Sequence, residues 1–290
     1  MPFDRVVLIF NPHSTGDAKG KAHQLRDEVL AGRPDARVEL LPTEFAGHAR
    51  TLAREAAGDG RPLIVSVSGD GGYNEVVNGI MDAGDTHAVA TVVAAGNAND
   101  HHRVTAPRPL PEALAEDEVR RMDLLRLSVN GEKLARYAHS YIGFGITPVV
   151  AVELEKGTKG SLREIVTVVR SFNNFRPLRV ELADGGRIAI DSLVFSNIPQ
   201  MAKVLKLSDN GDPEDGLFEV TLTPHEPRWR AVTKAVHAAT TGLGEQPSVT
   251  DYRFTALKAA PLQIDGEVLE IEEGDRVQIE IAPGALAVLR

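Results

Sequence analysis

Short apolar runs alternate with helical patterns along the N-terminal part of the chain, and this alternation narrows the folds open to the sequence more than any other feature. Strands are predicted over residues 5–10, 36–41, 63–67 and 88–94, and helices over residues 18–31, 47–57 and 73–81. Parallel strands need crossover helices and are buried on both faces, so they read as continuous apolar runs. The alternation therefore predicts an α/β domain with a parallel sheet.

Beyond a proline cluster at residues 107–111, the pattern changes to strand pairs separated by turn signals. The turns are Asn130-Gly131, Asp184-Gly185-Gly186 and Asp265-Gly266. Such turns between alternating strands predict hairpins. Helical patterns interrupt this part at residues 160–174 and 227–241.

The length and the change of pattern together predict two domains. The first is an α/β domain over residues 1–120, and the second is a mostly antiparallel, β-sandwich-like domain over residues 121–290.

Charge and composition exclude several classes of function. The chain carries 32 lysines and arginines against 41 aspartates and glutamates, and the net charge of −9 disfavours a protein that binds nucleic acid through a basic surface. It has no cysteine, which excludes disulfide scaffolds, thiolate zinc sites and cysteine nucleophiles. We see no signal-peptide core, and the longest apolar stretch, residues 88–95, is far shorter than the roughly 20 residues that span a bilayer. We therefore expect a cytoplasmic protein.

A glycine-rich turn, Ser68-Gly69-Asp70-Gly71-Gly72, lies between a predicted strand and a predicted helix. Glycines let the backbone approach an anion closely, a helix N-terminus presents unpaired N–H groups, and Asp70 can hold Mg²⁺ against phosphates. This context predicts a phosphate site. The alternative is a tight turn that needs positive φ and uses Asp70 as the helix N-cap.

Two more turns follow predicted strands, Asn11-Pro12-His13-Ser14 after the first and Gly96-Asn97 after the fourth. The carboxyl ends of parallel strands share one edge of the sheet, and ligands of open α/β sheets bind at that edge. The three turns together therefore favour a ligand site over the structural alternative.

Further short segments accompany these turns in a fixed order. The full set is Asn11-Pro12-His13-Ser14, Thr43-Glu44, Gly47-His48-Ala49, residues 68–79, Gly96 with Asn99-Asp100, residues 215–220 and residues 264–267. Together they resemble the diacylglycerol kinase catalytic family, which includes bacterial soluble lipid kinases and the related sphingosine kinases.

The resemblance implies an ATP-dependent lipid kinase that uses Mg²⁺, with an α/β nucleotide-binding domain and a β-sandwich domain for the lipid substrate. The positions that match the family's phosphate-lining residues are Asn11, Thr43, Gly69, Asp70, Gly71, Gly72, Asn74, Glu75 and Asn97. Positions matching Mg²⁺ ligands are Asp212, Asp215 and Leu217, the first and last through their carbonyl oxygens. Glu267 matches the proton acceptor that phosphoryl transfer to a hydroxyl requires, with Asp265 close by.

The sequence departs from the family pattern at three of these places. Ser68 replaces a glycine, Gly72 replaces a threonine or serine, and Asn97 replaces a threonine, so two hydroxyls expected near phosphate are missing. The departures keep open a second hypothesis, a nucleotide- or phospholipid-binding homologue with impaired catalysis. A third hypothesis is a kinase of a soluble substrate such as NAD, because NAD kinases use a similar glycine turn.

A basic stretch gives this acidic chain one candidate surface for anionic lipid. Residues 156–187 carry seven lysines and arginines against three aspartates and glutamates, and apolar residues recur at helical spacing from Leu162 to Phe172. The ordinary interpretation is that the apolar stripe packs on the β domain. The functional interpretation is peripheral contact with the inner face of a membrane. A homodimer is also left open.

Overall fold

The computed structural model describes residues 3–14, 16–105, 108–116, 118–131, 133–145, 177–201, 205–225 and 241–289. The predicted helix over residues 160–174, almost all of the one over 227–241, and the apolar stripe with most of its basic neighbours lie outside the described residues. The chain divides into two compact units. Unit 1 runs to Asp123 and also includes the C-terminal segment from Pro283, whereas unit 2 is Leu124–Ala282.

Unit 1 is built on a parallel sheet, as the apolar runs predict. Its strands are β1 (Arg5–Phe10), β2 (Val38–Pro42), β3 (Pro62–Ser68) and β4 (Val89–Ala94), in the order β2-β1-β3-β4. The last residues of β17 (Arg276–Leu289) return to this sheet, where Val288 pairs in parallel with Ala90. β1, β3 and the start of β4 are buried because helices cover both faces of the sheet.

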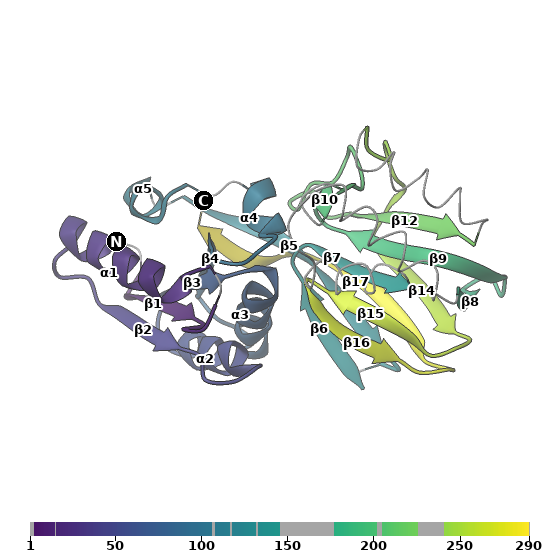
Figure 1. Ribbon diagram of the computed structural model, residues 1–290, viewed down its shortest axis with the longest axis horizontal. Helices are drawn as coiled ribbons and strands as arrows, with labels where there is room; N and C mark the ends of the chain where they lie inside the picture. The colour runs from purple at the N-terminus through teal and green to yellow at the C-terminus, as the bar shows by residue number, and fades with distance from the viewer. Residues whose placement is uncertain are drawn as a thin grey trace. The chain divides into compact units, whose positions relative to one another are not determined.

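The helices lie on opposite faces of this sheet (Figure 1). They are α1 (Ala18–Gly32), α2 (His48–Ala57), α3 (Asp70–Asp82), α4 (Asp100–Thr105) and α5 (Leu110–Glu116). α1 and α5 share one hydrophobic core with the strands, whereas α2 and α3 pack together on the other face. Gly79 permits that contact, because a Cβ atom there would lie 2.3 Å from the Arg50 carbonyl oxygen.

α3 begins at Asp70, three residues before the predicted start of the helix at residue 73. Gly71 and Gly72 suggest a turn in the sequence, but both residues lie in the first helical turn.

Unit 2 is strand-rich and mostly antiparallel, as predicted. Its longer strands are the second half of β5 (Val119–Val129), β6 (Leu134–Ala138), β7 (Tyr141–Gly145), β8 (Leu178–Leu182), β9 (Arg187–Ser196), β12 (Phe218–Pro224), β14 (Asp251–Ala256), β15 (Ala260–Ile264), β16 (Glu267–Ile271) and most of β17. Shorter strands are β10 (Gln200–Met201), β11 (Leu205–Lys206) and β13 (Ser248–Val249). The neighbours run in the order β16-β15-β7-β9-β8-β14-β17.

The three predicted hairpin turns are present. Asn130 and Gly131 join β5 to β6 with φ angles of 50° and 72°, and Asp265 and Gly266 join β15 to β16 with φ angles of 45° and 100°. Positive φ at both central residues is typical of the tight turns that match the twist of a hairpin. Gly185, with φ of 83°, lies in the turn between β8 and β9.

The core of unit 2 is apolar and contains an aromatic group. The Phe144 ring meets the Phe195 and Phe254 rings edge to face, with centroids 6.1 and 5.2 Å apart. Such contacts stabilise a core by more than the burial of their apolar area alone would.

Within the described residues, no helix is long and apolar enough to cross a membrane.

Candidate functional site

The carboxyl ends of β1, β3 and β4 meet at one edge of the unit 1 sheet. The Ser14 hydroxyl, after β1, donates a hydrogen bond to the Ala95 carbonyl oxygen, after β4, at 2.9 Å. Gly16 packs against the same carbonyl group, and it has no room for a side chain because a Cβ atom there would lie 2.2 Å from the Ala95 oxygen. The Thr43 amide donates to the Phe10 carbonyl oxygen at 2.8 Å, which brings the end of β2 to the end of β1.

Two glycine turns touch each other at this edge. A Cβ atom at Gly96 would lie 2.3 Å from Gly69 Cα, and a Cβ atom at Gly69 would lie 3.0 Å from Gly96 Cα. Both positions therefore require glycine for space. The alternative interpretation of the sequence, a turn that needs positive φ, is wrong for this segment, because neither Gly69 nor Gly71 nor Gly72 has a positive φ.

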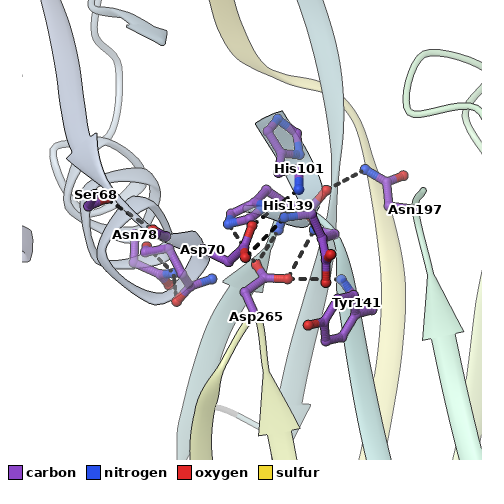
Figure 2. Close-up of polar contacts among 12 residues, drawn as sticks. Ser68, Asp70, Asn78, His101, His139, Tyr141, Asn197 and Asp265 are labelled. Atoms are coloured by element: carbon purple, nitrogen blue, oxygen red, sulfur yellow. Dashed lines mark hydrogen bonds and ion pairs between the residues drawn. The ribbon is translucent and has the colours of Figure 1, made fainter. Parts of the chain in front are cut away.

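Asp70 connects two helices. It is the first residue of α3, and Gly69 is the N-cap, so the expectation that Asp70 caps its own helix is wrong. Its carboxylate instead accepts hydrogen bonds from the amides of Asp100 and His101, both at 3.1 Å, at the start of α4 (Figure 2). A carboxylate at a helix N-terminus is favourable because of the helix dipole.

The first turn of α3 leaves main-chain donors at the sheet edge. The first amides of an α-helix have no acceptor within the helix. Among the described residues, no acceptor is paired with the amide of Gly71 or Gly72. Together with the positive end of the helix dipole, these donors favour an anion.

Lys21 adds a cation to this edge. It was not among the phosphate-lining residues predicted from the sequence. It lies in α1, and its ammonium group donates to the Ala94 carbonyl oxygen, at the end of β4, at 2.6 Å. A lysine in the helix that follows the first-strand turn is the signal that could have identified it. In a chain of net charge −9, it supplies the local positive charge that an anionic ligand needs.

Two histidines at the start of α4 have different environments. The His101 ring is buried, with its centroid 5.2 Å from that of Tyr73. Burial lowers the pKa of His102 below its ordinary value of 6.5; the Asp70 carboxylate raises it, and the Lys21 ammonium lowers it further. The charges of Asp70 and Lys21 therefore both act on the His102 ring.

The other predicted phosphate-lining residues fall into two groups. Asn11 and Asn97 are exposed at the sheet edge, and the Asn11 side chain accepts a hydrogen bond from the His13 amide at 2.9 Å. Asn74 and Glu75 are held within unit 1. Asn74 is buried and accepts from the Asn78 side chain at 3.1 Å, and the Glu75 carboxylate accepts from two amides at the start of α2.

In unit 2, the predicted metal ligands share one loop before β12. Asp212 and Asp215 are exposed, and each side chain accepts a hydrogen bond from the amide two residues later in the loop. Asp212 accepts from the Glu214 amide at 3.0 Å, and Asp215 accepts from the Leu217 amide at 2.9 Å. No group of three acidic, histidine or cysteine side chains that could hold a metal occurs in the described parts of the chain. A cation here would therefore need the main-chain carbonyl oxygens of Asp212 and Leu217.

Glu219 follows this loop and is only 1% exposed. Burial raises its pKa to about 7; a hydrogen bond from Ser248 opposes the shift, and the nearby Asp215 and Asp212 charges add to it. One Glu219 carboxylate oxygen is buried without a hydrogen-bond partner. A Cβ atom at Gly211 would lie 3.1 Å from that oxygen. An all-oxygen donor set with an unsatisfied carboxylate beside it fits Mg²⁺.

Asp265 and Glu267 lie on either side of a hairpin turn in unit 2. The buried Asp265 carboxylate accepts hydrogen bonds from the amides of His139, Ser140 and Tyr141 at 2.7 to 3.1 Å, and His139 Nε2 lies 3.3 Å from it (Figure 2). Glu267 is exposed at the start of β16. Within unit 2, Asp265 therefore fixes the turn, and the Glu267 side chain faces solvent.

Comparisons with known proteins bear on the N-terminal part first. Residues 5–127 match the model of the diacylglycerol kinase catalytic domain, which confirms the resemblance seen in the sequence. A comparison with curated proteins found no significant match.

Solved structures of proteins from Bacillus anthracis str. Sterne resemble the whole chain. One, described as a diacylglycerol kinase, has a TM-score of 0.72 and 18% identity and covers 100% of this chain and 97% of its own. Two others carry that description provisionally. Their TM-scores are 0.74 and 0.71, their identities 18% and 16%, and they cover 100% of this chain and 98% and 97% of their own. At these identities, the likeness establishes the fold.

Proposed function

We propose that the protein is an ATP-dependent kinase that phosphorylates the hydroxyl group of a lipid alcohol such as diacylglycerol. The observation that carries this proposal is the close contact of Gly69 and Gly96 beside the first turn of α3. There, the amides of Gly71 and Gly72 and the Lys21 ammonium can meet the oxygens of a bound phosphate. Such groups neutralise the charge of the transferred phosphoryl group.

Asp70 has an indirect role in this proposal. Its carboxylate holds the start of α4, and α4 follows directly the turn that contains Gly96 and Asn97. Asp70 therefore keeps the turns after β3 and β4 in register. Asn11, Thr43 and Asn97, at the same edge, are candidates to contact other parts of the nucleotide.

The other candidate residues for this reaction lie in unit 2. The loop with Asp215 and the carbonyl oxygens of Asp212 and Leu217 would hold Mg²⁺, which supplies charge neutralisation when bound. Glu267 accepts the proton of the attacking hydroxyl, because its carboxylate is exposed and so accessible to a substrate. Asp265 positions the turn that carries Glu267 and does not itself take the proton, since its oxygens accept main-chain hydrogen bonds.

The lipid acceptor rests on the family match and on the description of the solved neighbour as a diacylglycerol kinase. Gly72 and Asn97 motivate the alternative of a nucleotide-binding homologue with impaired catalysis. A cytoplasmic location, peripheral membrane contact and a homodimer stay predictions.

Transfer of radiolabelled γ-phosphate from ATP to a panel of lipid alcohols and to NAD tests the proposal. We expect label in a lipid product that depends on Mg²⁺ and on Glu267. Label in NAD alone would identify a kinase of a soluble substrate. ATP binding without any transfer would favour the impaired homologue.

A further inference from the structure

Ser68 and Gly72 compete for one space at the start of α3. Residue 72 lies in the first helical turn, and Cα–Cβ bonds in a helix tilt toward its N-terminus. A Cβ atom at Gly72 would therefore point back at Ser68, where it would lie 2.7 Å from Ser68 Cβ and 2.8 Å from Ser68 Oγ. Ser68 Cβ is fixed by its own backbone, so the two side chains cannot coexist without a shift of the main chain.

The Ser68 hydroxyl has a local partner that a ligand can replace. Its oxygen lies 2.7 Å from the hydroxyl oxygen of the buried Ser66, and it donates to the Gly69 carbonyl oxygen of the next peptide at 3.0 Å. A hydroxyl has one donor and two acceptor sites. Ser66 can donate to the Ser68 oxygen, and the Ser68 O–H group must then turn away from the Gly69 carbonyl oxygen to donate to an external acceptor.

The same small volume thus receives a hydroxyl from either position. Ser68 is half-buried, at the point where β3 ends and where the amides of Gly71 and Gly72 begin. Ser68 thus supplies a hydroxyl in place of the one that the family pattern has at position 72, and it requires Gly72 to lack a side chain.

We infer that Ser68 is a binding residue of the nucleotide site and donates a hydrogen bond to a phosphate oxygen, with Gly72 as its obligatory partner. This inference rests on the proposed function, because it takes the ligand at this turn to be a nucleoside triphosphate. It makes the two departures from the family pattern a single, coupled exchange.

Four variants test the inference: Ser68→Ala, Ser68→Gly, Gly72→Ser and the double variant Ser68→Gly with Gly72→Ser. ATP affinity is measured by calorimetry with Mg²⁺, and the free energy of unfolding by urea denaturation without nucleotide. Ser68→Ala should weaken ATP binding by about tenfold or more, the usual loss for a hydrogen bond to a charged group, and should also lower the free energy of unfolding, because the buried Ser66 hydroxyl loses its partner. Half-buried Thr255, in β14 of unit 2, gives a hydroxyl control as Thr255→Val.

The double variant gives the sharper result. Gly72→Ser alone should destabilise the fold, because its Cβ meets Ser68 Cβ, and removing the Ser68 side chain should restore both stability and ATP affinity. Ser68→Gly alone should weaken ATP binding, because no hydroxyl at position 72 replaces the one removed. Parent affinity in Ser68→Ala, or equal stability of Gly72→Ser with and without Ser68, would overturn the inference.

The two measurements separate this inference from the proposed function. If the parent protein fails to bind ATP, the proposed function is wrong, and with it the phosphate role of Ser68. If the parent binds ATP and Ser68→Ala binds it equally well, only the inference fails.

Discussion

At the scale of single residues, Asp265 and Glu267 show how one short turn separates structure from chemistry. The Asp265 carboxylate accepts three main-chain hydrogen bonds in the interior of unit 2, whereas Glu267 is exposed. The family resemblance placed both in one catalytic group, because a matching motif does not reveal which side chain is buried. The two residues should therefore differ in what their substitution affects.

Asp265→Asn should reduce the free energy of unfolding by about 1–3 kcal/mol, because an amide oxygen cannot replace both carboxylate oxygens and buried N–H donors lose an acceptor. Urea denaturation measures this change. Unaltered stability in Asp265→Asn would contradict a structural role.

Glu267→Gln should leave stability unchanged and lower kcat by about 10²–10⁴-fold, the range for loss of a positioned general base. Steady-state kinetics with the lipid substrate measures kcat, and ATP affinity serves as the control because the base does not hold the nucleotide. A parent-like kcat would make Glu267 an ordinary surface charge.

Lys21→Ala should weaken ATP binding, because it removes the ammonium group beside the Ala94 carbonyl oxygen, at the phosphate edge. Lys19→Ala is the matched control, since Lys19 is exposed two residues earlier in the same helix. Calorimetry at low and high salt should show a larger salt dependence for the parent than for Lys21→Ala. Equal losses in the two variants would indicate a general charge effect.

At the scale of elements, carboxylates join the helices of unit 1 to one another. Asp70 of α3 holds α4, and Glu75 of α3 accepts from the Gly47 and Ala49 amides, at 3.1 Å each, at the start of α2. α2 has no side-chain cap of its own, so Glu75 supplies one from a neighbouring helix. The resemblance placed Glu75 at the phosphates, and the structure gives it this second role.

Glu75→Ala should lower the free energy of unfolding by about 1 kcal/mol, the usual cost of losing a helix cap. Glu55→Ala, at an exposed position of α2, is the control. Weaker ATP binding in Glu75→Ala with parent stability would instead support the role implied by the resemblance.

His102 should make stability depend on pH. Its pKa in the fold is lowered by burial, so the unfolded chain binds the proton more readily near the ordinary value of 6.5. The contribution to stability is thus present above pH 6.5 and is lost as pH falls toward the lower pKa of the fold. Urea denaturation on both sides of pH 6.5 should show a smaller loss in His102→Gln than in the parent or in exposed His13→Gln.

Much of the fold follows from periodicity, and the site follows only in part. The apolar runs identified β1, β3 and β4 because strands buried on both faces have few polar residues. The predicted start of α3 and the alternative of Asp70 as its N-cap were wrong, because local glycine preference favours a turn, and the contact of Asp70 with the α4 amides joins residues distant in sequence. The steric conflict between side chains at positions 68 and 72 could not be predicted from the sequence, because it depends on the direction in which a Cβ atom at position 72 points.

At the scale of the whole molecule, an acidic chain must bind an anionic nucleotide. The net charge of −9 opposes that binding. In unit 1, main-chain donors, a helix dipole and Lys21 favour the anion in place of a basic surface. Each unit keeps its own hydrophobic core. The nucleotide and metal parts of the proposal can therefore be tested separately.

The most direct test of the central claim follows glycine amides by NMR. Protein labelled with nitrogen isotope in glycine alone is titrated with ATP and Mg²⁺, with resonances assigned by single substitutions. We expect the amide signals of Gly71 and Gly72 to shift with ATP concentration, while those of the hairpin glycines Gly131 and Gly185 stay in place. ATP that binds while the Gly71 and Gly72 signals remain unmoved would contradict the claim that the first turn of α3 holds the phosphates.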